Sequence, residues 1–359
     1  MKIPKVRTGQ PSVDLTESEF KARAALEFQG PRFDSHRRAV ESIVNVEWVR
    51  YDQSEKYAHS QPAGLGFKNP KVEVGLEWLE TKKTISEAKR EHDRKGAKPH
   101  YLIINGSPRS DHTCPGEMSK SHRLSEIAIR HLEKKNAVVE YLDLSRVTSE
   151  YGKNIHPCKG CVSTAMPLCH WPCSCYPNHA LGQTQDWMNE IYPMWVRAHG
   201  VMIITPVHWY SPPSVLKLMM DRMVCADGGN EDYTSTNGKD PKKAKALEIK
   251  GWDFPRHLEG RTFSVITHGD SEGVLHVKQS LGGWLRDMGL SSAGNQSELD
   301  RYIDYYGTYA GSHDALDKDR LLMREVGYAA QLLEQSVKEI LKNPRNRAPT
   351  DGNDAIRKK

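Results

Sequence analysis

Residues 99–109 read PHYLIINGSPR, and this stretch decides the fold class. The continuous apolar run at residues 101–104 has the length and character of a buried strand. Asn105, Gly106 and Pro108 are turn-forming residues that end the run. A buried strand followed directly by such a turn predicts the start of a βα unit, with the turn at the carboxyl end of the strand.

Further apolar runs alternate with helical patterns after this first strand. Strands separated by helices indicate parallel pairing through βαβ crossovers, with helices on both faces of the sheet. The strands are continuous apolar runs, as expected when both faces are covered. We therefore predict a flavodoxin-like, doubly wound, five-stranded parallel sheet of order 2-1-3-4-5. The predicted strands are 101–104, 137–144, 201–205, 262–268 and 290–294, and the predicted helices are 119–135, 183–199, 214–224 and 274–288.

The chain divides into three parts by composition. Residues 1–98 are polar and broken, with helical stretches around 17–28, 36–51 and 74–96, and predict an N-terminal helical arm or cap. Residues 99–342 form the predicted α/β domain, and residues 343–359 a flexible tail. Two stretches, 226–260 and 295–317, exceed what the bare fold requires, and long loops of this kind are usually functional or interfacial.

The composition is that of a globular protein. Hydrophobic residues make up 37% and charged residues 27% of the 359 residues. The net charge of +5 is too slight to indicate a nucleic-acid-binding face. The sequence has neither a signal-peptide pattern nor an apolar run of membrane-spanning length, so we expect a cytoplasmic protein without a membrane partner.

The loop that contains Ser107 and Arg109 and the start of the helix near Ser119 are expected to meet at the edge of the sheet where the strands end. Ligands of open parallel sheets bind at the carboxyl ends of the strands. Ser107, Ser119 and Ser121 offer hydroxyl groups, Arg109 offers a charged fork, and the helix that begins near Ser119 offers its amino end. These groups suit a monophosphate, although an ordinary turn with capping serines fits the same residues. Neither a P-loop nor a GxGxxG motif is present.

Three motifs in order carry a resemblance to a known family. Residues 101–109, 205–222 and 267–273 resemble the NADPH-dependent FMN reductase family, which includes iron–sulfur flavoproteins and quinone reductases. The resemblance covers roughly residues 99–295. It implies that the first loop holds the FMN phosphate, that the second follows the isoalloxazine edge, and that the third lies near the other side of the ring. The stretch between Arg109 and Ser121 is longer than in the family.

The resemblance implies a set of FMN-binding residues. His208 is a candidate either to donate to a flavin oxygen or N5, and so to tune the flavin, or to face solvent. Trp209 and Tyr210 either supply flat surface for the flavin or cover the core. Asp221 and Arg222 are expected on a helix surface. The implied FMN-binding residues are Ser107, Arg109, Ser119, Ser121, Pro206, Val207, His208, Trp209, Tyr210, His268, Gly269, Asp270 and Gly273.

The implied activity is an FMN-dependent NAD(P)H oxidoreductase. Hydride would pass from NAD(P)H to FMN, and electrons would then pass to a quinone, free flavin or another small-molecule acceptor. The cofactor supplies the reactive group, so no dedicated catalytic side chain is required. The alternatives are a non-catalytic flavin electron carrier or redox sensor, and a cluster-containing flavoprotein. The resemblance also implies a homodimer or homotetramer.

Five cysteines gather within one stretch after the second strand. Thiolates suit a four-iron cluster or zinc, for which Cys158, Cys161, Cys169 and Cys173 are the candidate ligands. Residues 157–161 resemble the start of the cluster motif of iron–sulfur flavoproteins, but Cys169 comes later than the third ligand of that motif. A redox-active dithiol and inert, reduced cysteines fit the sequence as well. Cys114 and Cys225 are isolated and are expected to be structural.

One further pattern competes with the flavin interpretation. His131 and Glu133, followed by residues 157–161, match the H-x-E and P-C-x-x-C pattern of zinc-dependent deaminases. His131, however, is predicted in the last turn of a helix, where a basic side chain is common. The deaminase interpretation also leaves the loops after the strands unexplained, so we disfavour it.

Overall fold

The computed structural model describes residues 2–134, 136–161, 166–269, 272–303 and 308–342. The predicted tail at residues 343–359 lies outside these ranges. None of the described helices combines the length and the apolar character needed to cross a bilayer.

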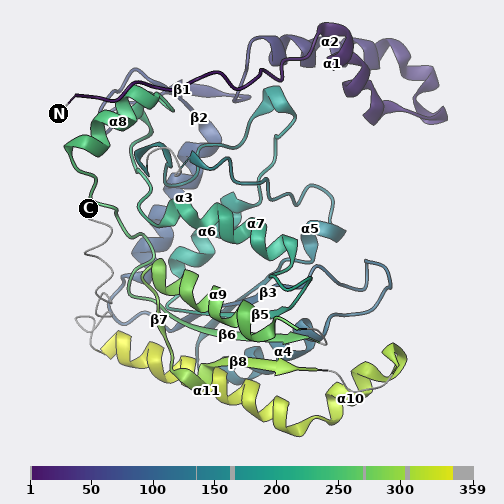
Figure 1. Cartoon of the computed structure of the whole chain (residues 1–359), viewed down its shortest axis with the longest axis vertical. Coiled ribbons are helices and arrows are strands. Elements are labelled where there is room, and N and C mark those ends of the chain that lie inside the picture. Colours follow the sequence, from purple (N-terminus) through teal and green to yellow (C-terminus); the bar gives the residue numbers. More distant parts are fainter. Residues whose placement is uncertain (1, 135, 162–165, 270–271, 304–307, 343–359) are drawn as a thin grey trace.

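A parallel sheet of six strands forms the centre of the molecule (Figure 1). The order is β4-β3-β5-β6-β7, and β8 also pairs with β6. When the strands of this sheet are numbered along the chain from β3, the order β4-β3-β5-β6 becomes 2-1-3-4, and β7 and β8 share the fifth place. This is the predicted order 2-1-3-4-5. The flavodoxin-like order is thus confirmed, while the predicted number of five strands is wrong. The strands are β3 (His100–Asn105), β4 (Val138–Asp143), β5 (Gly200–Pro206), β6 (Thr262–Gly269), β7 (Ser291–Ser292) and β8 (Glu298–Tyr302).

The extra strand arises because the last strand position is interrupted. Ser292 pairs with Phe263, and the next pair along β6 is Val265 with Glu298. Residues 293–297 therefore lie opposite Ser264 alone, whose Oγ donates to the carbonyl of Ser297 at 2.7 Å. This segment, which contains a 3-10 turn at Asn295–Ser297, splits one strand into two. The stretch 295–317, expected to be a loop, consequently includes β8.

Helices cover both faces of the sheet, as predicted. Successive strand side chains alternate between faces, so Leu102 and Ile104 join one apolar core and Tyr101 and Ile103 the other. The Tyr101 face is covered by α4 (Lys120–Glu133) and α11 (Arg320–Lys342). The opposite face is covered by α6 (Met188–Arg197), α7 (Ser214–Arg222) and α9 (Val274–Asp287).

The N-terminal region contains an extended part and a packed part. In Figure 1, α1 (Glu17–Ala24) and α2 (Arg37–Asp52) project away from the sheet. They are followed by the antiparallel pair β1 (Ser60–Pro62) and β2 (Glu73–Gly75) and then by α3 (Leu76–His92). Ile85 and Ala88 of α3 belong to the main core. The boundary at residue 98 stays a prediction, with α3 packed on the domain that follows it.

Three further helices of the described chain lie in the connections. They are α5 (Arg146–Ser149), α8 (Pro241–Lys250) and α10 (Ser312–Lys318). Helix α8 lies in the predicted insertion at residues 226–260, and the Asp240 side chain caps it by accepting from the main-chain N–H of Lys242 at 2.8 Å. The insertion is therefore partly ordered as a helix.

Candidate functional site

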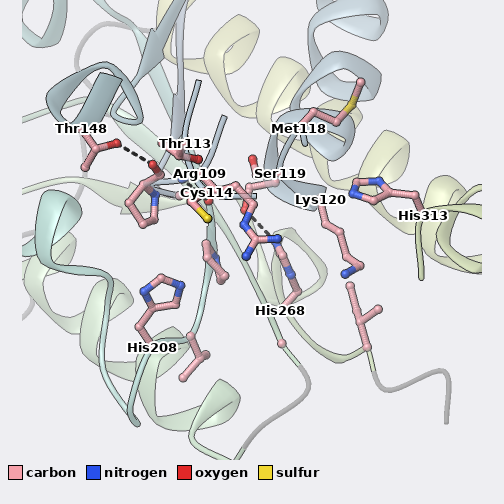
Figure 2. A pocket seen from close by; sticks show the side chains of 17 residues that line it. Arg109, Thr113, Cys114, Met118, Ser119, Lys120, Thr148, His208, His268 and His313 are labelled. Atoms are coloured by element: carbon pink, nitrogen blue, oxygen red, sulfur yellow. Dashed lines mark hydrogen bonds between the residues drawn. The ribbon is translucent and has the colours of Figure 1, made fainter. Parts of the chain in front are cut away.

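A cavity of about 520 Å³ lies at the carboxyl ends of β3, β5 and β6 (Figure 2). We call it the sheet-edge cavity. Most of the FMN-binding residues implied by the sequence line it: Ser107, Arg109, Ser119, Ser121, Pro206, Val207, His208, His268 and Gly269. Pro108 of the first loop and Thr113 line it as well. Six further lining residues were not expected there from the sequence: Cys114, Met118, Lys120, Thr148, Ile303 and His313.

The first loop is held in place by side chains at the ends of two strands. Asn105 Oδ1 accepts from the main-chain N–H of Ser107 at 3.0 Å, and its Nδ2 donates to Asp143 Oδ1 at 2.9 Å. The Ser107 hydroxyl oxygen accepts from the N–H of Arg109 at 3.2 Å. A Cβ atom at Gly106 would lie 2.6 Å from Thr205 Oγ1. Glycine therefore allows β3 and β5 to approach closely where the loop begins.

The amino end of α4 forms a second wall of the cavity. Ser119 caps this helix, because its Oγ accepts from the N–H of His122 at 3.1 Å. Ser121, fully buried, places its Oγ 2.8 Å from His268 Nε2. The positive end of the helix dipole thus lies beside the cavity.

The cavity lining is cationic. Arg109 and Lys120 point into the space near His208 and His268 in Figure 2. Among the described residues that line this cavity, none is acidic. Burial lowers the pKa of His268 to about 3, with further contributions from Lys120 and His208. Burial, and then Arg109, also lower the pKa of His208. These histidines are therefore neutral at neutral pH, while the arginine and lysine supply the positive charge.

The second loop ends in a tight turn with two exposed aromatic side chains. His208 and Ser211 exchange main-chain hydrogen bonds of 2.9 and 3.0 Å. Between them, Trp209 and Tyr210 have φ values of 46° and 65°, a left-handed conformation that is unfavourable for bulky residues. Trp209 is 93% exposed and Tyr210 61% exposed. Neither side chain lines the cavity, and their exposure contradicts the alternative that they cover the core.

The third loop lies against the second. The N–H of Val207 donates to the carbonyl of His268 at 3.0 Å. Gly273, with φ of 101°, approaches Tyr210 so closely that a Cβ atom would lie 3.0 Å from its Cα. Gly273 thus abuts the second loop without lining the cavity, and Asp270 lies outside the described residues.

The cysteines line a second, much smaller space, which we call the cysteine cavity. Its volume is about 10 Å³, room for about one water molecule. All seven cysteines of the chain are free thiols. Cys225, expected to be isolated, belongs to this cavity. The cysteines that line it are Cys158, Cys161, Cys169, Cys173, Cys175 and Cys225.

The arrangement of these thiols does not fit a metal site. Over the described ranges, no three or more His, Cys, Asp or Glu side chains are placed to hold a metal ion. The metal interpretation of Cys158, Cys161, Cys169 and Cys173 stays a prediction without structural support. Cys161 Sγ instead lies 3.5 Å from Cys175 Sγ. A hydrogen bond from Cys175, followed by the effect of Lys239, lowers the pKa of Cys161 to about 6.

Two other sequence expectations are settled by side-chain packing. Arg222, expected on a helix surface, is buried and pairs with buried Asp186, with Nη1 3.0 Å from Oδ1. That expectation was wrong for Arg222, while Asp221 is exposed as expected.

His131 Nε2 lies 3.4 Å from Glu334 Oε2 of α11, on the sheet face opposite the cysteine cavity. The deaminase pattern is therefore not brought together.

Several solved structures are similar to this chain. RosB with a bound 8-demethyl-8-formylriboflavin-5′-phosphate is similar at 14% identity over 72% of this chain and 85% of that one, with a TM-score of 0.48. The NADH:FMN oxidoreductase EMOB is similar at 13% identity over 72% and 99%, with a TM-score of 0.39. An FMN-dependent NADH-azoreductase from Bacillus anthracis str. Ames Ancestor shows 19% identity over 65% and 99%, with a TM-score of 0.36.

The family assignment comes from the sequence. A comparison with curated proteins gave no match. The family model for NADPH-dependent FMN reductase matches residues 99–300, which is more than half of the chain and includes the loops around the sheet-edge cavity from β3, β5 and β6. The chain therefore belongs to the NADPH-dependent FMN reductase family and is an FMN-dependent oxidoreductase.

Proposed function

We propose that the sheet-edge cavity binds FMN and that the protein catalyses NAD(P)H-dependent reduction of a small-molecule acceptor such as a quinone or free flavin. The cationic lining at the amino end of α4, without an acidic side chain among its described residues, is the observation that carries the proposal. A phosphate dianion is stabilised by a helix amino end and by arginine or lysine. Ser107, Arg109, Ser119 and Ser121 would hold the phosphate.

The flavin ring would then lie toward the second and third loops. Pro206, Val207 and His208 line the cavity from one side, and His268 and Gly269 from another. Neutral His208 would act as a hydrogen-bond donor at the ring edge. When bound, FMN supplies the capacity to accept a hydride from nicotinamide and to pass electrons on to an acceptor. The chain's own part is to bind, orient and shield the reacting groups.

The projecting turn at Trp209 and Tyr210 suits a role beside the ring rather than in the core. Exposed aromatic side chains held in an unfavourable backbone conformation often mark a functional surface. We propose that this turn contacts the nicotinamide, the acceptor or a second copy of the chain in a homodimer or homotetramer. Trp209 and Tyr210 would then complete the site from its rim.

FMN titration of the purified protein tests the proposal. We expect tight binding of FMN, much weaker binding of riboflavin, and steady-state oxidation of NADPH or NADH when a quinone is added. Folded protein that fails to bind FMN would overturn the site assignment. An FMN-bound protein that neither nucleotide reduces would leave the electron carrier as the better interpretation.

A further inference from the structure

We propose that Cys161 and Cys175 are a redox-active thiol pair, which a small-molecule disulfide converts reversibly into an intramolecular disulfide. The two sulfur atoms lie 3.5 Å apart, in contact but not bonded. They are 14 positions apart in the sequence, and the fold brings them together at one wall of the cysteine cavity. This site is separate from the proposed FMN site.

Lys239 singles out this pair among the six thiols of the cavity. Its Nζ lies 2.6 Å from Cys175 Sγ and 3.3 Å from Cys161 Sγ. Within the described parts of the chain, no carboxylate forms an ion pair with this ammonium group. A largely buried ammonium is costly unless an anion accompanies it. A thiolate on Cys161, whose sulfur lies 3.3 Å from the ammonium nitrogen, provides that anion.

The surroundings favour Cys161 as the attacking sulfur. Cys161 is partly exposed, whereas Cys175 is buried, with 5% exposure. Thiolates rather than thiols attack disulfides, and a nearby cation stabilises the thiolate. Cys169, Cys173 and Cys225 are also buried. Cys161 is therefore the thiol that combines access from solvent with a neighbouring cation and a second sulfur in contact.

The exchange balances in two steps. The Cys161 thiolate attacks one sulfur of the small disulfide, so that a mixed disulfide forms and one thiolate leaves. Cys175 then gives its proton to a departing thiolate, attacks Cys161 Sγ and expels the second small thiol group. Two electrons pass from the protein pair to the small molecule, whose S–S bond breaks as the Cys161–Cys175 bond forms. A dithiol reductant reverses both steps.

Disulfide mapping of the full-length protein tests the proposal. The protein is equilibrated with oxidised glutathione, its free thiols are alkylated under denaturing conditions, and the intact mass is measured. We expect two fewer alkylated cysteines than in the reduced protein and full recovery after reduction. A protease that cuts after Leu168 separates Cys161 from Cys169, Cys173 and Cys175, so the expected bond joins two fragments. Fragmentation then distinguishes Cys161 from Cys158, and Cys175 from Cys169 and Cys173.

Variants identify the contribution of each group. Cys161→Ser and Cys175→Ser should each abolish the two-thiol loss, whereas Cys114→Ser, outside the cysteine cavity, should retain it. Lys239→Met should slow disulfide formation about tenfold or more, and Lys239→Arg should slow it less, because arginine keeps the cation. The mapping of the unaltered protein does not depend on how the variants fold.

Three outcomes would overturn the proposal. A bond between any other two cysteines would reassign the pair. No loss of free thiols at any ratio of oxidised to reduced glutathione would show that the pair is inert. Stoichiometric iron or zinc in the purified protein, with the thiols protected until the metal is removed, would show that they are ligands. None of these outcomes bears on FMN binding, so this proposal and the proposed function can fail separately.

Discussion

The sheet-edge cavity and the cysteine cavity differ in where they place their cationic side chains. In the first, Arg109 and Lys120 line a wide space, and none of its described lining residues is acidic. In the second, Lys239 contacts two sulfurs and Arg222 pairs with Asp186 inside the protein. A cation that lines a wide space can reach a ligand, whereas a cation enclosed beside its partner stabilises the fold or activates that partner. We therefore expect substitutions of the cations in the sheet-edge cavity to affect ligand binding, and substitutions around the cysteine cavity to affect stability or thiol reactivity.

The largest expected effect comes from removing the internal partner of Arg222. Asp186→Asn keeps the size of the side chain but leaves the buried guanidinium without its counter-charge. We expect the free energy of unfolding to fall by about 3–5 kcal/mol, measured by chemical denaturation. The matched control is Asp221→Asn, which breaks an exposed ion pair with Lys217 on the helix that also carries Arg222. This variant should lower the free energy of unfolding by only about 0–1 kcal/mol. Equal effects of the two variants would contradict a stabilising role of the buried pair.

The next effect concerns the open cavity. Arg109→Ala should weaken FMN binding by about 1.5–3 kcal/mol, roughly 10- to 100-fold, because a charge-assisted hydrogen bond to phosphate is lost. Riboflavin binding should change little, so the preference for FMN over riboflavin should shrink. Arg146→Ala, in an exposed pair with Glu150 close to the cavity-lining Thr148, serves as the control. Equal losses of FMN and riboflavin affinity would mean that Arg109 does not contact the phosphate.

Local patterns predicted the frame that supports the sheet-edge cavity. The apolar runs at β3, β5 and β6 identified the strands, and the loops after them identified most of the cavity lining. Lys120 was missed although it adjoins Ser119 at a helix amino end, a position that itself favours a ligand-binding role. Helix α11 was also missed, although Leu322, Val326, Leu333 and Val337 repeat at helical spacing.

Other features could not be predicted from local patterns. The split between β7 and β8 depends on how residues 293–297 fold against Ser264. Lys239 reaches Cys161 across 78 positions of sequence, and Asp186 reaches Arg222 across 36. Such contacts are set by tertiary packing. The open cavity was therefore easier to predict than the closed one, because strand ends converge by topology while buried pairs converge only through packing.

A smaller effect is expected from pH. The pKa of His268 in the folded protein, about 3, lies below the usual value of about 6.5 for histidine, so the unfolded chain binds a proton first on acidification. Stability is therefore lost as the pH falls below about 6.5 and toward 3. We expect His268 to account for a loss of about 2 kcal/mol between pH 7 and pH 5, measured from denaturation curves at both values.

Two variants separate this titration from the hydrogen bond. His268→Gln should lack the loss, whereas Ser121→Ala, which removes the partner at 2.8 Å but keeps the histidine, should retain most of it. If His268→Gln and the unaltered protein lose the same free energy on acidification, the pH dependence comes from other groups.

The smallest effect on stability concerns the turn at the rim of the sheet-edge cavity. Trp209 adopts a left-handed conformation that glycine adopts without strain, and its side chain is almost fully exposed. Trp209→Gly removes the strain of this conformation but makes the unfolded chain more flexible, which costs part of the gain. We therefore expect the free energy of unfolding to rise by about 0.5–1 kcal/mol. Ser54→Gly, at another exposed left-handed position at the end of α2, should have a similar or smaller effect. Only Trp209→Gly should also lower turnover of NAD(P)H, because only this side chain lies beside the proposed flavin site. A gain in stability with full turnover would mean that the strained aromatic turn serves neither the nucleotide nor the acceptor.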